Sequence, residues 1–351
     1  MLGPLWHRNW ANETAMLGRR SGQIAQKNSG LQKVVAPVIL TVYYADTGAV
    51  MCGIVGYFDK TGANEQPLGE VLLRMLEALA CRGPDSAGVA MFGAYRPNYF
   101  VAQVKLGDNG HDTERARQVH AVALNFGAQE FSQTDSYLRF IFRETDDLKP
   151  FLLSVESIGE DAEVVSVGRG LEIVKQVGSP SCLEQAFNIS KFCGSHGIGH
   201  TRLSTESVVD LSHSQPFWGH GYPDLAIVHN GHITNYHQLR RRYRQHGVRF
   251  YTENDSEIVA MFLAGKLKQG ADLRSALASM VMELDGSFSC FAATDSAFGF
   301  VKDPFSFKPL LLAETDSFVA LANEEIAIRG AIQGDYVVRE AQAKEVRVWQ
   351  R

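Results

Sequence analysis

The sequence contains no apolar run of the length that crosses a bilayer, which takes about 18 consecutive apolar residues. Residues 34–44 are apolar, but they have only the length of a short signal-peptide core. Asp46 follows where a signal peptidase would need small residues, which disfavours secretion. We therefore predict a cytoplasmic protein that does not enter a membrane.

Paired cysteines are also missing, because the five cysteines are scattered and odd in number. This distribution excludes a disulfide framework and fits a reducing compartment. No cysteine cluster has the spacing of an iron–sulfur ligand set. The pattern Cys193-x-x-His196-x-x-x-His200 lacks the second ligand pair of a zinc site. We predict that the protein holds no metal and no cofactor.

The sequence has no excess of positive charge, since its net charge is −5 and it has no long basic run. This balance argues against a general nucleic-acid-binding protein. The local cluster Arg240, Arg241, Arg242 and Arg244 is typical of a solvated helix face, with an anionic partner surface as the alternative.

The most informative stretch that is present runs Met51-Cys52-Gly53-Ile54-Val55-Gly56. If the mature chain starts at Cys52, that residue carries a free α-amino group beside its thiol, which makes a nucleophile and a general base in one residue. The reference pKa of an α-amino group, about 7.7–8.0, suits a base near neutral pH. Residues 1–51 would then be a propeptide or an untranslated leader. The alternative is that Cys52 is a small buried residue at the start of a strand.

Hydrophobic periodicity predicts many short strands and few helices after Cys52. Residues 104–195 do not continue this pattern, and we expect them to form an elaboration inserted between core strands. Strands are expected at 88–92, 151–155, 163–167, 197–200, 225–229, 286–293, 299–302, 310–313 and 318–322, and helices at 67–81, 113–125, 180–192, 234–246, 255–268 and 272–284. Without βαβ alternation, this order indicates an α+β domain with largely antiparallel sheets.

Four later segments bring in polar groups that a cysteine nucleophile would need. GHTRLST (199–205) ends a predicted strand with an arginine, and VHNG (228–231) ends another with an amide and a glycine. NDSE (254–257) opens a helix with a carboxylate, and DPFSFKPL (303–310) connects two strands.

Together with MCGIVGYF and RGPDSAG, these motifs resemble, in order, those of the class II or N-terminal-nucleophile glutamine amidotransferases. The resemblance extends from Cys52 to about Asn323, and it implies a type-2 amidotransferase domain over residues 52–345. It also implies a four-layer αββα sandwich. The chain is most similar to stand-alone glutaminase-like subunits of split glutamate synthase or N-methylglutamate synthase systems, given Thr205-Glu206-Ser207, the 104–195 insertion and the terminal Val346-Arg347-Val348-Trp349.

The resemblance assigns roles to individual residues. Cys52 would attack the side-chain amide of glutamine and form a thioester, while Asn230 and the Gly231 backbone N–H would form the oxyanion hole. Arg202 would hold the substrate carboxylate as a bidentate fork, and Asp255 would pair with the substrate ammonium group. The binding segments also contain Thr205 and His229, and we expect His229 to support the neighbouring oxyanion donors.

Glu206 and Gln215 depart from the family, in which histidine is frequent at both positions. We expect this departure to affect the rate of glutamine turnover more than the specificity for glutamine. The resemblance further implies a hetero-oligomer in which ammonia passes to a flavin-dependent, glutamate-synthase-like subunit. Two alternatives remain open from the sequence. One is a non-catalytic subunit that senses glutamine or serves as a scaffold, and the other is a hydrolase of other amides, against which Arg202 and Asp255 argue.

Overall fold

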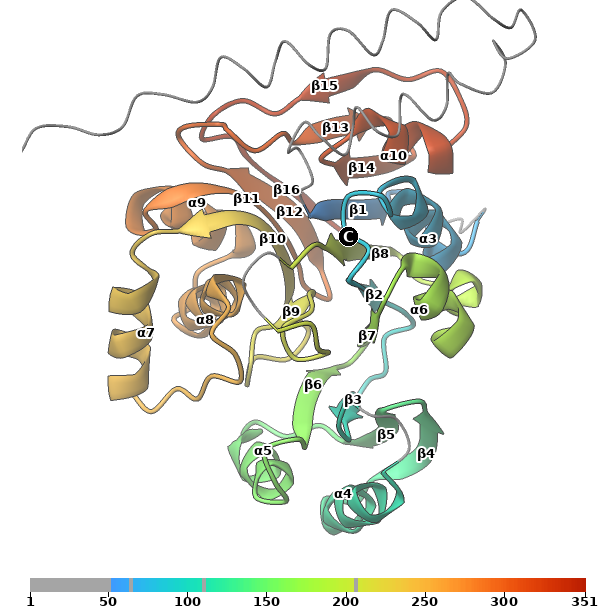
Figure 1. The fold of residues 1–351 in the computed structure, drawn as a ribbon, viewed down its shortest axis with the longest axis vertical. Helices are drawn as coiled ribbons and strands as arrows, with labels where there is room; N and C mark the ends of the chain where they lie inside the picture. The colour runs from blue at the N-terminus through green and yellow to red at the C-terminus, as the bar shows by residue number, and fades with distance from the viewer. Residues whose placement is uncertain (1–51, 63–65, 109–111, 205–207) are drawn as a thin grey trace, which may run out of the picture. The chain divides into compact units, whose positions relative to one another are not determined.

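The computed structural model describes residues 52–62, 66–108, 112–204 and 208–351. The expected leader, residues 1–51, and the positions Thr205 and Glu206 lie outside the described residues. Two sheets stacked on each other form the centre of the described part (Figure 1).

The first sheet has seven strands, each antiparallel to its neighbours. In spatial order they are β15 (Val338–Glu340), β13 (Leu311–Glu314), β14 (Phe318–Ala322), β1 (Gly53–Asp59), β8 (His196–Arg202), β2 (Ser86–Phe92) and β7 (Leu171–Val177). The side chains of β1 alternate between the two faces, as the strand period requires. Ile54 and Phe58 enter the core between the sheets, whereas Val55 faces the outer helices.

The second sheet has five antiparallel strands and lies against the first. In spatial order they are β16 (Val346–Gln350), β12 (Ala297–Lys302), β11 (Gly286–Ala293), β10 (Ala226–Ile233) and β9 (Phe217–Trp218). Val228 of β10 belongs to the core that the two sheets share, and Ile227 belongs to the core on the helix side.

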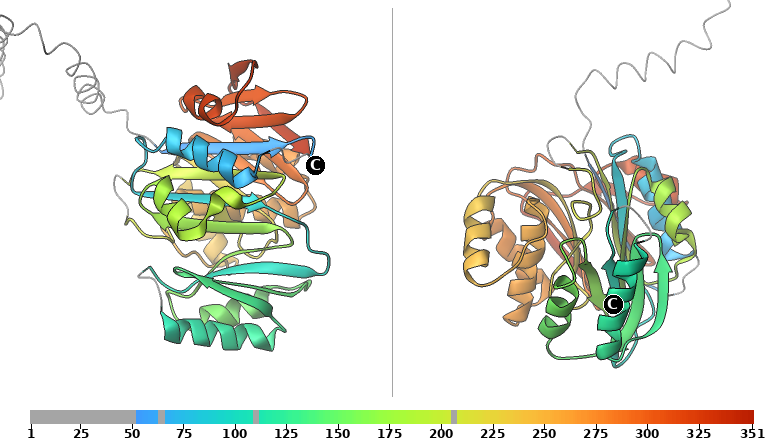
Figure 2. Two further views of the ribbon diagram at one scale, coloured as in Figure 1. Left: turned by 90° about the vertical axis from the view of Figure 1, so that its right-hand side faces the viewer. Right: turned by 60° about the horizontal axis from the view of Figure 1, so that its bottom comes forward.

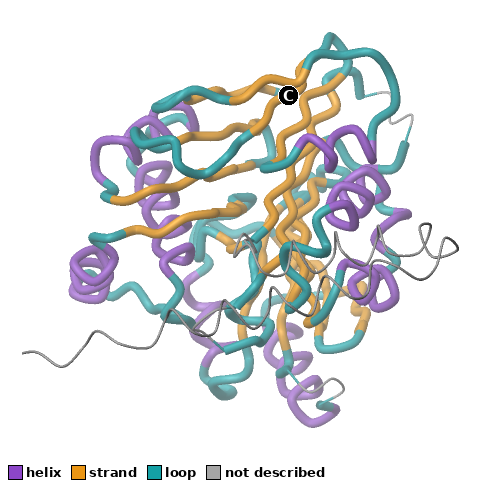
Figure 3. The backbone as a smooth tube through the Cα atoms, turned by 45° about the horizontal axis from the view of Figure 1, so that its top comes forward, coloured by secondary structure: helices purple, strands orange, loops and turns teal. Residues whose placement is uncertain are grey.

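Helices cover the outer faces of both sheets (Figures 2 and 3). On the first sheet these are α3 (Leu68–Ala78), α6 (Pro180–Phe187), the 3-10 turn η1 (Ile189–Lys191) and α10 (Glu325–Ala331); on the second they are α7 (Tyr236–Gln245), α8 (Asp255–Lys268) and α9 (Leu273–Glu283). The result is a four-layer αββα sandwich, so the α+β fold expected from the sequence is confirmed.

A third sheet forms a separate layer at one end of the sandwich, at the bottom of Figure 1. Its members are β4 (Gln129–Thr134), β5 (Tyr137–Arg143), β3 (Tyr99–Lys105) and β6 (Glu163–Gly168), together with α4 (Thr113–Asn125) and α5 (Lys149–Glu156). We call residues 99–168 the inserted layer. The Cβ of Val119 in α4 and the ring of Phe151 in α5 are buried in one hydrophobic core with β3 and β5.

Two of the expectations for residues 104–195 are corrected by the structure. β7 and α6 fall within the 104–195 segment but belong to the sandwich, because β7 pairs with β2 along its whole length. The strand expected at 151–155 is wrong, since these residues lie in α5. Pro150 lies in the first turn of that helix, where proline is favoured. Phe151, Leu152 and Val155 are buried on one face of the helix.

The helices expected at 113–125 and 255–268 are confirmed. Asn254 caps α8, because its side chain accepts a hydrogen bond from Ser256 N. Within the described ranges, no helix combines the length and apolar character needed to cross a membrane.

Candidate active site

Cys52 lies directly before β1, beside the end of β8. The antiparallel register pairs Gly53 with Thr201, so Cys52 is level with the last residues of β8. Its Sγ lies 3.6 Å from the carbonyl oxygen of Leu203. Burial raises the pKa of the Cys52 thiol, and the positive charges of Arg202 and Lys308 offset only part of this effect. The thiol therefore needs a base if it is to react near neutral pH.

Two asparagine side chains hold the main chain of Cys52. Asn230 Nδ2 donates to the Cys52 carbonyl at 2.7 Å, and Asn323 Nδ2 donates to the same oxygen at 3.1 Å. Asn323 Oδ1 also accepts from Ile54 N at 3.2 Å. Both lone pairs of the Cys52 carbonyl are thus used, which fixes the peptide plane that carries the thiol.

Asn323 was not among the residues expected from the sequence. It follows β14, which pairs with β1 so that Ala322 is opposite Val55. A polar residue one position beyond that strand must lie near Cys52, but the pairing of β14 with β1 is not readable from the sequence alone.

Gly231 is a position where only glycine fits. Its φ is +145°, and a Cβ there would lie 2.1 Å from the carbonyl oxygen of Ser287. The close approach of β11 thus explains the glycine that follows Asn230.

His229 lies next to Asn230 but faces the other side of the sheet, because side chains alternate along β10. Its Nδ1 lies 2.8 Å from Ser256 Oγ, on the α8 side. Burial lowers the pKa of His229. The ring thus supports the α8 side of β10, while Asn230 reaches Cys52 on the other face.

Asp255 lies at the start of α8, close to the backbone that follows Gly231. Its Oδ2 accepts from Ile233 N at 2.9 Å, and its Oδ1 lies 3.9 Å from His229 Nδ1. The carboxylate side chain is 18% exposed. It is therefore available from the solvent side of this corner.

Arg202 is buried at the end of β8, and its Nη1 donates to the Val208 carbonyl at 2.9 Å. Asp85 holds the backbone around Arg202 with two hydrogen bonds. Its N donates to the Arg202 carbonyl at 3.0 Å, and its Oδ2 accepts from Ser204 N at 2.7 Å. Burial lowers the pKa of the Arg202 guanidinium, and the negative charges of Asp210 and Asp85 oppose this effect.

Gln215 binds the main chain of β10 with both ends of its carboxamide. Its Oε1 accepts from His229 N at 2.7 Å, and its Nε2 donates to the His229 carbonyl at 2.9 Å. The same Nε2 lies 3.2 Å from His200 Nε2, which must then accept. Burial lowers the pKa of His200 to about 3, so its neutral ring can act as this acceptor.

A cavity of about 650 Å³ lies at the opposite end of β1, where Phe58, Ser195 and Trp349 contribute to its lining. β1 has seven residues, which at about 3.3 Å per residue separates this cavity from Cys52 by roughly 20 Å. It is therefore distinct from the site around the thiol. Among the described residues, no group of three or more His, Cys, Asp or Glu side chains is arranged to hold a metal ion.

Comparison with known proteins identifies the family. A model of the glutamine amidotransferase domain matches residues 200–329. A putative glutamine amidotransferase from Methanothermobacter thermautotrophicus is 34% identical over 307 residues, which cover 86% of this chain and 100% of that protein. The chain belongs to the class II glutamine amidotransferase family.

Further relatives of this amidotransferase chain agree with that result. The glutamine amidotransferase-like protein GlxB from Rhizobium meliloti is 35% identical over 281 residues, covering 79% of this chain and 91% of that protein. An amidophosphoribosyltransferase from Methanocaldococcus jannaschii is 27% identical over 180 residues, covering 50% of this chain and 38% of that protein.

Solved structures support the fold. The allosteric regulatory enzyme of purine biosynthesis matches with a TM-score of 0.56 and 18% identity, covering 85% of this chain and 46% of that chain. Glutamine phosphoribosylpyrophosphate amidotransferase from B. subtilis matches with a TM-score of 0.54 and 17% identity, covering 85% of this chain and 49% of that chain. These likenesses concern the fold, and the fold expected from the sequence motifs is confirmed. The family expected from the motifs is confirmed by the relatives above.

Proposed function

We propose that the chain hydrolyses L-glutamine to L-glutamate and ammonia through a thioester on Cys52. The observation that carries this proposal is the convergence on Cys52 of the Asn230 amide and the end of β8 that bears Arg202. A nucleophile, an amide donor and a cation at one corner are the groups that acyl transfer from a free amino acid needs.

In the proposed reaction, the thiolate forms a bond to the side-chain carbonyl carbon of glutamine. The negative charge of the tetrahedral intermediate is held by Asn230 Nδ2, which has a second N–H besides the one given to the Cys52 carbonyl, and by Gly231 N–H. The C–N bond breaks, and ammonia leaves with the proton taken from the thiol. Water then attacks the thioester, which releases glutamate and restores the thiol.

The proposed base is the α-amino group of Cys52, which exists only when the chain starts there. The raised pKa of the buried thiol supports this step, because such a thiol stays protonated without a base. We therefore propose that residues 1–51 are absent from the active form and that residues 52–345 are the functional domain.

Arg202 and Asp255 are proposed to bind the carboxylate and ammonium groups of glutamine, with Thr205 in the same binding segment. His229 contributes through β10 and not by contact, given where its ring lies. The ammonia acceptor is proposed to be a flavin-dependent, glutamate-synthase-like subunit in a cytoplasmic hetero-oligomer.

The test compares glutamate release from glutamine by protein that starts at Cys52, by its Cys52→Ala variant and by the full chain. We expect activity only in the first, with Asn230→Ala lowering kcat by about 10²- to 10³-fold. Cys193→Ala is the matched control, because Cys193 is exposed and lines the distant cavity. Equal rates with and without the Cys52 thiol would refute the mechanism.

A second candidate function is glutamine binding without turnover by the chain that retains residue 51. The buried, protonated thiol of Cys52, with its Sγ next to the Leu203 carbonyl, favours this state as long as no α-amino group is present. Calorimetric titration of the full chain with glutamine separates the two states, since binding without glutamate release identifies the second.

A further inference from the structure

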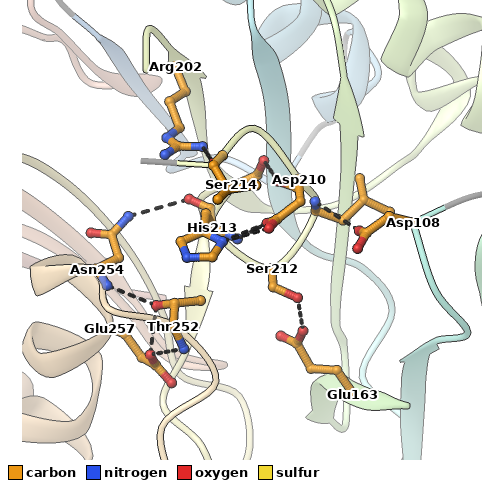
Figure 4. Close-up of polar contacts among 12 residues, drawn as sticks. Asp108, Glu163, Arg202, Asp210, Ser212, His213, Ser214, Thr252, Asn254 and Glu257 are labelled. Carbon is orange, nitrogen blue, oxygen red and sulfur yellow. Dashed lines mark hydrogen bonds and ion pairs between the residues drawn. The ribbon is translucent and has the colours of Figure 1, made fainter. Parts of the chain in front are cut away.

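Three side chains of the inserted layer contact the segment that follows the glutamine-site strand β8. We call residues 208–216 the clamped segment. Asp108 Oδ1 accepts from Leu211 N at 3.1 Å (Figure 4). Lys105 Nζ donates to Ser212 Oγ at 2.5 Å, and Ser212 Oγ in turn donates to Glu163 Oε2 at 2.5 Å.

Lys105 and Glu163 are buried, whereas Asp108 lies at the surface, with its Oδ1 3.5 Å from Lys105 Nζ. Lys105 and Glu163 are 3% and 7% exposed, and their charged groups lie 3.6 Å apart with the Ser212 hydroxyl bridging them. Hydrogen bonds to charged groups are roughly twice as strong as neutral ones. The inserted layer therefore holds the clamped segment more firmly than an exposed contact would.

The clamped segment in turn contacts three elements of the candidate active site. At its start, the Val208 carbonyl accepts from Arg202 Nη1 at 2.9 Å. In its middle, the His213 carbonyl lies 3.4 Å from the side-chain nitrogen of Asn254, which caps α8 just before Asp255 (Figure 4). Near its end, Gln215 binds the backbone of His229.

The segment is also stiffened from within. Asp210 accepts from His213 N at 2.7 Å and lies 2.8 Å from His213 Nδ1. Ser214 Oγ donates to the Asp210 carbonyl at 2.6 Å. A displacement at Leu211 or Ser212 therefore moves the segment as a unit and does not stay local.

We propose that the inserted layer positions the glutamine pocket, with Asp108, Lys105 and Glu163 acting as positioning residues through the clamped segment. The inference rests on the proposed function of Arg202 and Asp255 as the groups that bind glutamine. These three residues do not touch the substrate. They fix the places of Val208 and His213, and thereby the orientation of the Arg202 fork and the start of α8.

The test compares glutamine kinetics for Asp108→Ala, Ser212→Ala and a matched control, Asp161→Ala, in protein that starts at Cys52. Asp161 pairs with Arg115 in the same inserted layer and has no contact with the clamped segment among the described residues. Losing one such hydrogen bond should raise KM for glutamine by about 3- to 10-fold, with kcat within about 2-fold. Asp108→Asn retains an oxygen that can accept from Leu211 N, so it should restore KM to near the wild-type value.

Hydrogen exchange supplies a readout that does not depend on turnover. Faster exchange in residues 208–216 is expected in Asp108→Ala and Ser212→Ala and not in Asp161→Ala. An unchanged KM in both clamp variants overturns the inference, as does an equal KM rise in the control. A lower kcat at constant KM also overturns it, because the clamp would then act on chemistry and not on binding.

Failure of the proposed function gives a different pattern. If the wild-type chain releases no glutamate, the proposed function is refuted, and glutamine affinity of the Cys52→Ala background still tests the clamp. Weaker calorimetric binding in Asp108→Ala than in Asp161→Ala then supports the clamp, and equal or absent binding overturns it. If Asp108→Ala does not fold, the comparison of Ser212→Ala with Asp161→Ala decides.

Discussion

Two loops near the candidate active site are held by different kinds of contact. The clamped segment, residues 208–216, is tied to side chains more than 40 positions away, among them Asp108 and Glu163. The loop 303–310, which brings Lys308 toward the thiol, is tied to its own first residue and to the neighbouring strand β11. The clamped segment thus depends on the inserted layer, whereas the loop 303–310 is held within the sandwich.

Asp303 shows how the second loop is closed. Its side chain accepts from Phe305 N at 2.6 Å, from Ser306 N at 2.9 Å and from Phe288 N at 3.0 Å. Phe305 and Phe307 remain 60% and 75% exposed, with their ring centroids 5.8 Å apart and the rings stacked. We therefore expect stability to depend on Asp303 and much less on these two rings.

The largest effect on stability is expected from Asp303→Ala. Asp303 is fully buried, and its loss leaves the buried Phe288 N–H without its acceptor. The free energy of unfolding should fall by about 2–4 kcal/mol, measured by urea denaturation. Asp316→Ala, in an exposed turn, should change it by less than about 0.5 kcal/mol. An Asp303→Ala protein as stable as that control would show that Asp303 does not hold the loop.

A smaller effect is expected from acid, and it should act on the first loop, where His200 contacts Gln215. The pKa of His200 is lowered from 6.5 to about 3, so the unfolded chain binds a proton below pH 6.5 that the folded chain does not. Stability should therefore fall as pH decreases from 6.5, by about 2 kcal/mol between pH 7 and 5 for this group.

The measurement is the free energy of unfolding at several pH values, for the wild type and for His200→Gln. The free energy of unfolding of the variant should fall less steeply with decreasing pH, and the difference in slope should correspond to about one bound proton. His196, whose pKa is lowered to about 4 by burial, adds a parallel loss in both proteins. The exposed His237→Gln should retain the wild-type slope. An identical slope in His200→Gln would mean that this ring does not remain neutral in the folded state.

The smallest effect is expected from replacing the exposed rings, Phe305→Ser with Phe307→Ser. Because both rings lie largely in solvent, thermal unfolding should shift by the equivalent of less than about 0.5 kcal/mol. A larger loss would reveal packing that the loop needs, and the contrast between the two loops would then be weaker.

Local signals made much of the fold predictable. The motif NDSE predicts the helix at 255–268, and a short apolar run that begins at Gly286 predicts the strand at 286–293. The apolar run at 151–155 has the length of a strand, but Pro150 in the first turn favours the helix that the structure shows there.

The site was predictable only where its residues lie in linear motifs. Cys52, Asn230 and Arg202 lie in such motifs, and the structure brings them to one corner. Their roles in catalysis and binding stay predictions. Asn323 and Asp108 act through strand pairing and through contacts between layers. No sequence pattern near either residue records those long-range partners.

The carboxamide of Gln215 takes the place of a peptide unit, since it gives and receives one hydrogen bond with the same residue of β10. A histidine ring presents its donor and its acceptor on different edges, so it cannot form this two-point pair. Exchanging glutamine for histidine at this one position would therefore release the end of the clamped segment from the backbone of β10.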